Sequence, residues 1–229
     1  MIQIPDIPRS ADMTTQDYAY FRLRNAIMVG ALRPRTALTF RGLAEQLGLS
    51  PTPIREAVRR LSSEHALEVL ENRRLRVPEM TPGRFEELAQ LRLALETHAA
   101  TRAFAYLSDV TIDTMARLDA RMDGAVKSRD LDALTRMNHQ FHRLLYCLNP
   151  HQTVMPLIES IWLQLGPFQR RVIEDIDRTY VIDRHKEMLD AMHKRDLPGL
   201  CAAIERDIED GSIRSGRQML HCTKDSIPI

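Results

Sequence analysis

The 229-residue sequence contains little glycine, few aromatic residues and few cysteines. Glycine occurs 9 times and aromatic residues make up 5% of the chain, which argues against a fold built from many strands and tight turns. The residues that replace them, mainly Leu, Ala, Arg, Glu and Met, favour helices. We therefore expect a mainly α-helical protein, long enough for two domains that each bury a core.

The three cysteines exclude two common uses of that residue. Cys147, Cys201 and Cys222 are an odd number and show neither CxxC nor CxxH spacing. Neither a disulfide framework nor a zinc finger is therefore indicated. This usage favours a reducing, cytoplasmic compartment.

Long apolar runs are also missing. No stretch approaches the roughly 18 uninterrupted apolar residues of a membrane span. The first residues, "MIQIPDIPRSADM", lack the basic start and apolar core of a signal peptide. We expect a soluble cytoplasmic protein that has no membrane partner.

The net charge of +1 would by itself argue against a polyanionic partner, but the charges are unevenly distributed. Residues 1–80 hold 12 Arg and no Lys against 9 acidic residues, a net charge of +3, and the remainder of the chain has a net charge of −2. The N-terminal third is therefore the place to search for a nucleic-acid surface.

The N-terminal part of the chain has the pattern of a winged helix-turn-helix. Residues 1–14 show no periodicity and are expected to form a flexible arm. Helical patterns follow in "QDYAYFRLRNAIMVG", "FRGLAEQLG" and "LSPTPIREAVRRLSSEH", and two short apolar runs, "ALEVL" and "LRVPEM", indicate a hairpin. Three helices and a hairpin predict this domain over residues 15–79, with a hinge near residue 80.

Two prolines lie at the start of the third expected helix. Gly48 is suited to the left-handed conformation that ends the preceding helix, and Ser50 stands where an N-cap hydroxyl is expected. Pro51 and Pro53 then fall in the first turn, where a missing N–H is tolerated and the fixed φ is already helical. The prolines therefore begin a helix.

This arrangement places polar residues where a recognition helix enters the major groove. Thr52 and Arg55 lie at the N-terminal end of the third helix, and Arg59 follows one turn later. Arg41 opens the preceding helix and Arg74 lies in the wing. Taken singly, each arginine could equally be a solvated surface residue; together they predict a DNA-binding surface.

Beyond residue 80 the pattern is helical throughout. The expected helices cover residues 83–106, 111–128, 130–148, 152–175, 178–195 and 197–220. Six helices with short connections predict an all-α antiparallel bundle over residues 80–221. Residues 222–229 are expected to form a frayed tail.

Four polar residues in this bundle have spacings that suggest convergence. Asn138 and His142 are one turn apart, and His185 and Asp207 lie at similar distances on either side of the "DLPG" turn. Four oxygen or nitrogen ligands from three helices could meet at mid-bundle and hold a divalent metal. Two alternatives stay open: direct effector binding without metal, or a hydrogen-bonded polar cluster that fixes helix register.

The stretch "LAEQLGLSPTPIREAVRRL" resembles the DNA-binding domain of the GntR family of bacterial transcription factors, and the resemblance spans about residues 16–79. It implies that Arg41, Ser50, Thr52 and Arg55 contact operator DNA. Two positions depart from the family pattern. Pro51 stands where many members have a base-reading arginine. Arg74 stands where the wing usually has a glycine.

The following segment resembles the FCD ligand-binding domain of the FadR subfamily, in its shorter, VanR-like six-helix form. The resemblance runs from about residue 81 to 221 through "LRLALE", "NHQFHRLLY" and "RHKEMLDAMHKRDLPGL". Family members with a metal usually have Asp and His at the first positions and His at the last. Asn138 and Asp207 replace two of these ligands, and Zn, Ni, Mn and Mg are not distinguished.

The resemblance also suggests that Arg92, in "LRLALE", faces an effector cavity, where it would select a carboxylate by bidentate hydrogen bonds. Its alternative role is an i, i+4 ion pair with Glu96.

These observations predict a homodimeric, ligand-responsive transcriptional regulator, more often a repressor in this family. It would bind double-stranded operator DNA at a palindrome and sense a small organic acid. Two other functions remain: a metal-dependent helical-bundle enzyme that carries a winged helix, and an effector-free interaction module. The bundle shows no nucleophile motif and no paired carboxylates beside the predicted site, which argues against the enzyme.

Overall fold

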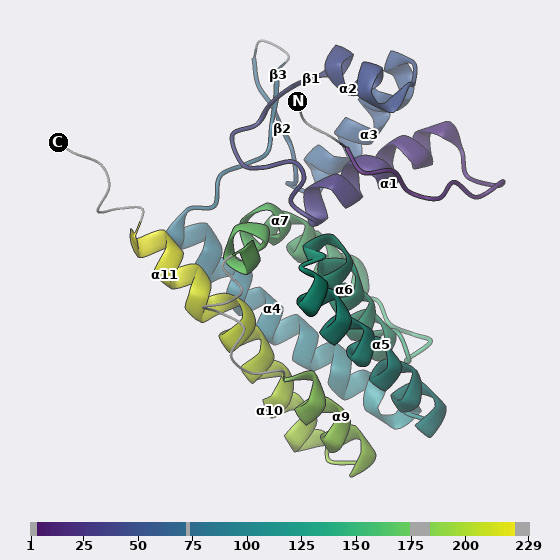
Figure 1. The fold of residues 1–229 in the computed structure, drawn as a ribbon, viewed down its shortest axis with the longest axis vertical. Helices are drawn as coiled ribbons and strands as arrows, with labels where there is room; N and C mark the ends of the chain where they lie inside the picture. Colours follow the sequence, from purple (N-terminus) through teal and green to yellow (C-terminus); the bar gives the residue numbers. More distant parts are fainter. Residues whose placement is uncertain (1–3, 72–73, 175–183, 223–229) are drawn as a thin grey trace. The chain divides into compact units, whose positions relative to one another are not determined.

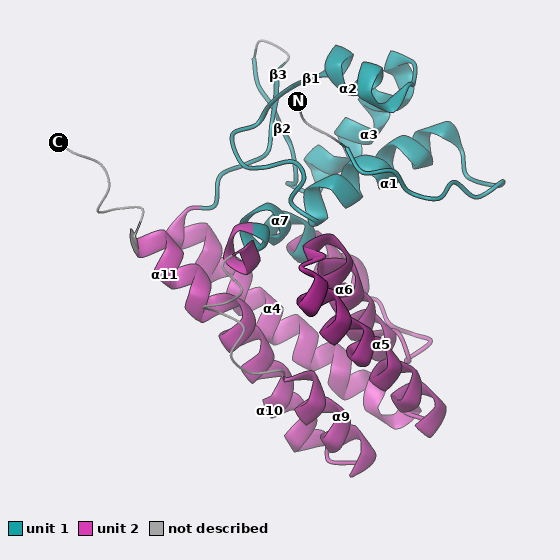
Figure 2. Cartoon of the chain, viewed as in Figure 1, with its two compact units in different colours: residues 1–80, 162–170 teal, residues 81–161, 171–229 magenta. Residues whose placement is uncertain are grey.

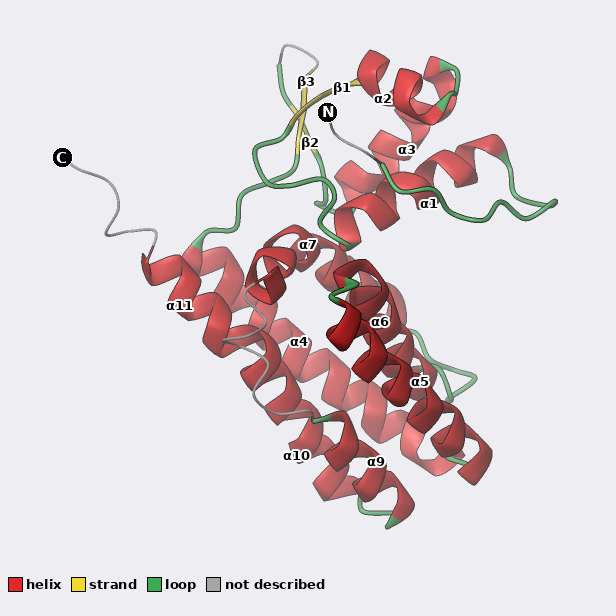
Figure 3. Ribbon diagram, viewed as in Figure 1, coloured by secondary structure: helices red, strands yellow, loops and turns green. Residues whose placement is uncertain are grey.

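A computed structural model describes residues 4–71, 74–174 and 184–222 of the chain (Figure 1). The chain forms two compact units (Figure 2). Unit 1 consists of residues 1–80 together with 162–170, and unit 2 of residues 81–161 and 171–229. Helices dominate both units, as the sequence predicts (Figure 3).

Three helices form the body of unit 1. They are α1 (Thr15–Met28), α2 (Phe40–Leu47) and α3 (Pro51–Ser63). Their apolar faces meet in one core, and α1 packs against α3. The largest fully buried side chains of these helices are Leu23, Ile27, Leu43, Ile54 and Leu61. The predicted helices are therefore present.

The turn between α2 and α3 follows the sequence prediction except at its cap. Gly48 is left-handed at φ 65° and ψ 32°, and α3 begins at Pro51. The prediction that Ser50 caps α3 through its hydroxyl is wrong: Ser50 occupies the N-cap position but makes no side-chain cap hydrogen bond. Pro53 contributes to this, because it stands at N3, one of the two positions whose N–H donates to an N-cap side chain, and it has no N–H.

The wing has one more strand than predicted. β2 (Glu68–Val69) lies within the first predicted run of the hairpin, and β3 (Arg74–Arg76) overlaps the second. β1 (Ala37–Thr39) pairs with β3 on the side opposite β2. All pairs are antiparallel, in the order β1-β3-β2. A three-residue strand offers too little alternation to be recognised from sequence.

The N-terminal segment that we expected to be flexible makes defined contacts with α1. Ile4 is buried in the core of unit 1. Arg22 donates from Nη2 to the carbonyl oxygen of Ile4 at 3.1 Å and from Nε to that of Pro5 at 3.3 Å. The hydroxyl of Tyr18 donates to Asp6 at 2.9 Å. Residues 4–6 are therefore held against α1.

The middle of α7 (Met155–Glu174) belongs to unit 1, although we had expected residues 152–175 to be a bundle helix. Leu163 is fully buried in the unit 1 core. A Cβ atom added at Gly166 would lie 2.7 Å from the carbonyl oxygen of Met28. The absence of a side chain at Gly166 thus allows the backbone of α7 to approach that of α1 closely.

Unit 2 is a helical bundle. Its elements, besides the ends of α7, are α4 (Pro82–Ala103), a 3₁₀ turn η1 (Phe104–Tyr106), α5 (Asp109–Ser128), α6 (Leu131–Tyr146), α9 (His185–His193), α10 (Leu197–Ile208), η2 (Glu209–Ile213) and α11 (Arg214–Cys222). α4 packs against α6 and α10, and α5 against α6 and α9. The expected helices are present, but the start of the one predicted over 178–195 lies outside the described residues.

The last predicted helix, residues 197–220, is interrupted. α10 and α11 are joined by η2, a π-helical turn in which the backbone N–H of Arg214 donates to the carbonyl oxygen of Glu209. None of the helices in the described ranges combines the length and the apolar character that a membrane span needs.

Candidate DNA-binding surface and metal centre

The N-terminal end of α3 carries three of the residues predicted to contact DNA. Ser50, Thr52 and Arg55 are solvent-exposed, whereas Ile54 and Val58 on the same helix are buried. Arg55 makes no ion pair within the described part of the chain. The helix N-terminus adds a partial positive charge, which favours phosphate. This surface has the chemistry that a DNA backbone requires.

The other two helical arginines of the predicted surface are engaged with neighbouring carboxylates. Arg41 donates to Glu45 at 2.8 Å, and Arg59 donates to Glu56 at 3.1 and 2.9 Å. The side chains of Arg41 and Arg59 are 90% and 74% exposed. Exposed pairs of this kind are worth about 0–1 kcal/mol, so either arginine can exchange its partner for a phosphate at little cost.

Arg60 on α3 has a structural role instead. Its guanidinium lies 3.7 Å from the ring centroid of Tyr20 and donates to Asp17 at 2.9 Å. Tyr20 in turn donates its hydroxyl to Glu64 at 2.6 Å. Burial and this hydrogen bond raise the pKa of Tyr20 to about 12. These contacts tie α1 to α3.

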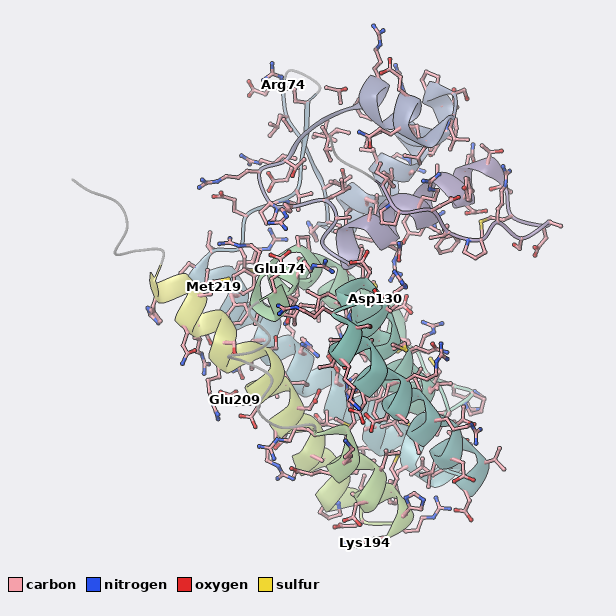
Figure 4. All side chains as sticks on the ribbon, viewed as in Figure 1. Arg74, Asp130, Glu174, Lys194, Glu209 and Met219 are labelled. Atoms are coloured by element: carbon pink, nitrogen blue, oxygen red, sulfur yellow. The ribbon has the colours of Figure 1, made fainter. Side chains whose placement is uncertain are left out.

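The wing contributes one further predicted residue. Arg74 is exposed at the start of β3, and Figure 4 shows its side chain there. Arg76, two residues further, is paired across the sheet with Glu68. A DNA contact from Arg74 remains a prediction, as do those from α2 and α3.

In unit 2 the structure brings together three of the four predicted metal ligands. His142 on α6, His185 on α9 and Asp207 on α10 place one ligand atom each within 4.8 Å of one another. The Nε2 atoms of His142 and His185 lie 3.4 and 4.0 Å from the carboxylate oxygens of Asp207. The exposed fraction of the side chain is 1% for His142, 8% for His185 and 19% for Asp207. This group could hold a metal ion.

The opposite ring nitrogens of the two histidines fix their tautomers. Nδ1 of His185 lies 3.2 Å from a carboxylate oxygen of Asp119, which can only accept, so Nδ1 carries the proton. Nδ1 of His142 lies 3.2 Å from the hydroxyl of Tyr146, whose proton is donated elsewhere, so this Nδ1 is also the donor. In neutral imidazoles both Nε2 lone pairs then face Asp207.

The chain of contacts from His142 ends at an ion pair. Tyr146 donates its hydroxyl to Glu96 at 3.0 Å, and Arg92 donates from Nε to the same carboxylate at 2.7 Å. Burial, with the charge of Glu96 and the hydrogen bond to it, raises the pKa of Tyr146 well above its ordinary value, so the phenol keeps its proton. The alternative role considered for Arg92, an ion pair with Glu96, is thus present.

Asp207 is the charged ligand of the group. Burial would raise its pKa, but when His142 and His185 are protonated, their positive charges and the hydrogen bond that His142 then donates, together with the charge of Arg92, outweigh burial and hold the pKa below its ordinary value. Asp207 is therefore a carboxylate, the form that binds cations.

Among the described residues, the ionisable side chains of this site carry an excess of negative charge. Three carboxylates lie in the site, those of Asp119, Glu96 and Asp207, and the first two belong to buried residues. Arg92 contributes one cation. With neutral imidazoles the formal sum is −2. Buried charges are normally balanced, so a divalent cation or two added protons would complete this site.

Asn138, the fourth predicted ligand, lies one turn before His142 on α6 and is half-buried. Its role as a ligand stays a prediction. Sequence reasoning missed Asp119 and Tyr146, which hold the histidines. The available signals were an acidic residue between the apolar positions Leu118 and Met122 of α5, and the i, i+4 spacing of His142 and Tyr146.

Comparison with known proteins agrees with both units. Residues 15–77 match the family model described as bacterial regulatory proteins, gntR family, and residues 87–210 match the FCD domain. The chain is 30% identical over 184 residues to the HTH-type transcriptional regulator McbR of Escherichia coli (strain K12), an alignment that covers 77% of this chain and 81% of that protein.

Two further relatives are informative. The solved structure titled E. coli McbR/YncC superposes with a TM-score of 0.84 at 25% identity, covering 90% of this chain and 99% of that one. The gluconate operon transcriptional repressor of Bacillus licheniformis is 25% identical over 196 residues, covering 82% of this chain and 79% of that protein.

Proposed function

Because this chain belongs to the GntR family of transcriptional regulators, with an FCD domain, and not to a family of enzymes, we propose that it is a ligand-responsive repressor. It binds a palindromic operator as a homodimer and senses a small organic acid in unit 2, at a site that holds a divalent metal. The name of the gluconate operon repressor, a relative, supports the direction of control.

The dimer is supported by the charge of the N-terminal third. A net charge of +3, with Arg41 and Arg59 already paired to carboxylates, gives one copy modest affinity for phosphate. Two copies on a two-fold operator double the contacts and set the half-site spacing.

The observation that carries the metal proposal is the meeting of two imidazoles and one carboxylate, one ligand atom from each within 4.8 Å of the others, among described side chains whose formal charges sum to −2 with neutral imidazoles. Imidazole and carboxylate suit first-row divalent ions, and His142, His185 and Asp207 leave coordination positions open. A bound divalent ion would supply an attachment point for the carboxylate of an effector.

Arg92 supports an acidic effector. Within the described residues its guanidinium donates only from Nε, to Glu96. Both terminal amino groups can therefore bind a carboxylate while Glu96 holds the side chain in place. An effector acts on transcription if it prefers one arrangement of the dimer, since only differential affinity moves that equilibrium.

The first experiment is a thermal titration of chelator-treated protein with Zn²⁺, Ni²⁺, Mn²⁺ and Mg²⁺. A metal at about 100 times its dissociation constant adds roughly 2.7 kcal/mol to the free energy of unfolding, a rise of several degrees in Tm. His185→Ala should abolish this rise. His193→Ala is the matched control, because His193 ends the same helix α9 and lies outside the ligand group.

The same assay then separates the remaining alternatives. A panel of mono- and dicarboxylic acids is added to metal-loaded and to chelated protein. A rise in Tm only with metal supports the metal-anchored effector, and a rise in both states means direct recognition. If no metal raises Tm in the wild type, protonated histidines balance Asp207, and the metal proposal is wrong.

A further inference from the structure

His185 lies at a position where the backbone of a metal ligand is poorly fixed by its own helix. It is the first residue of α9, a nine-residue helix, and Arg184 before it provides no side-chain cap. The first turn of a short helix frays readily. Its ring contact with Asp119 orients the imidazole, but does not hold the backbone at the start of α9. Another set of contacts must do so.

A network of charged side chains lies directly beside the two ligands. Arg184, which precedes His185, donates from Nε and Nη2 to one carboxylate oxygen of Asp210 at 3.0 and 2.6 Å. The side chains of Arg184 and Asp210 are only 15% and 17% exposed. The Nη1 of Arg184 is bound to Glu187 on the first turn of α9.

The same network also includes an arginine on α10 that is next to Asp207, the carboxylate ligand. Arg206, which precedes Asp207, donates from Nε and Nη2 to Glu187 at 3.0 and 2.7 Å. Each of the two ligands is thus the immediate chain neighbour of an arginine that holds the same glutamate.

The π-helical turn η2 provides the other anchor. It begins at Glu209, labelled in Figure 4, two residues after Asp207, and it contains Asp210. Asp210 is held on both oxygens, one by Arg184 and the other by Arg214 at 2.7 Å. Single π-helical turns within α-helices are frequent at functional sites.

We propose that Asp210, Arg184, Glu187 and Arg206 form a positioning network that fixes the start of α9 against α10, so that His185 faces Asp207 at the distance a metal requires. The inference rests on the metal site of the proposed function. None of the four residues belongs to the ligand group; they act through the ligands that they adjoin.

The test compares zinc affinity in full-length variants, with Zn²⁺ alone as the probe in competition with a chromophoric chelator. Asp210→Asn keeps the size of the side chain and removes its charge, and should weaken zinc binding about 10- to 100-fold, as loss of contacts outside the ligand shell does. Asp210→Glu should restore most of the affinity. Asp190→Asn is the control, because Asp190 pairs with Lys194 at the far end of α9.

The outcomes separate this inference from the proposed function. Zinc bound equally by wild type and Asp210→Asn overturns the network alone. A wild type that binds no zinc overturns the metal site and the network together. If Asp210→Asn does not fold, as judged by circular dichroism without metal, Arg206→Lys decides: it should weaken zinc binding while keeping the charge, and unchanged affinity overturns the network.

Discussion

At the scale of single residues, the chemistry of unit 2 depends on which ring nitrogen of each histidine carries the proton. Asp119 and Tyr146 both accept from Nδ1, and in the neutral imidazoles both Nε2 atoms therefore keep a lone pair on the side of Asp207, where a shared cation could accept it. The residues that set this arrangement are as necessary as the ligands themselves.

Asp119→Asn should weaken zinc binding about tenfold or more, because an amide can donate to Nδ1 of His185 and move the proton to Nε2. Competition with a chelator measures the loss. Asp123→Asn, one turn further along α5, removes an exposed pair with Lys186 and should leave the affinity unchanged. Equal losses in both variants would contradict the role given to Asp119.

Tyr20 provides a pH-dependent test of unit 1. The pKa of Tyr20 is about 12 in the folded protein against 10.0 in the unfolded chain, so the folded state keeps a proton that the unfolded state loses. Stability from this group is complete below pH 10 and is lost as the pH rises to about 12.

Denaturant unfolding at several pH values between 9 and 12 would show this loss, and Tyr20→Phe should remove it. At neutral pH the same variant should lower the free energy of unfolding by about 0.5–1.5 kcal/mol, since the hydrogen bond to Glu64 is gone. Tyr106→Phe, which changes an exposed tyrosine, is the control. In this variant the free energy of unfolding should still fall between pH 10 and 12, as in the wild type.

At the scale of elements, the turn between α2 and α3 is the part of the fold that presents DNA-contacting residues. It depends on the left-handed Gly48 followed by a helix that starts with proline. No heavy atom lies within 4 Å of a Cβ added at Gly48, so the glycine is needed for its backbone conformation and not for space.

Gly48→Ala should therefore destabilise the protein by about 1–2 kcal/mol, the cost of a left-handed conformation for an L-residue. Urea unfolding measures the change. Gly124→Ala, in the C-terminal part of α5, also meets nothing within 4 Å and should stabilise the protein by about 0.5–1 kcal/mol. A neutral Gly48→Ala would show that the turn tolerates another conformation.

The sequence predicted elements best where a local pattern determines them. The long helices follow from apolar periodicity, and the start of α3 follows from two prolines. β1 was missed because it is three residues long and gains its stability from pairing with β3. The Arg92–Glu96 pair was predictable because it is local. The contacts of Asp119 with His185 and of Glu96 with Tyr146 join distant segments, which periodicity does not encode.

At the scale of the whole molecule, function requires that the charged surface of unit 1 be specific and not merely basic. Three exposed residues at the start of α3 carry this role in our proposal, and Arg55, in contrast to Arg41 and Arg59, makes no ion pair in the described part of the chain. The near-neutral net charge of the chain keeps general attraction to DNA low.

Arg55→Ala should weaken binding to an operator selected from random duplexes by about 1–3 kcal/mol and reduce the salt dependence. Arg136→Ala on α6 removes the same charge from an exposed position in unit 2 and should have little effect. Selection that enriches no palindrome would contradict the dimeric operator, and unchanged affinity of Arg55→Ala would contradict the contact.

The contribution of α7 to unit 1 has a consequence for synthesis in the cell. Met80 and Trp162 are separated by roughly 80 residues, which a ribosome adds in about 4 to 16 s at rates of roughly 5–20 residues per second. During that interval the emerging N-terminal segment lacks Leu163, which completes its core. The N-terminal segment therefore has an incomplete core until residues 162–170 have been translated.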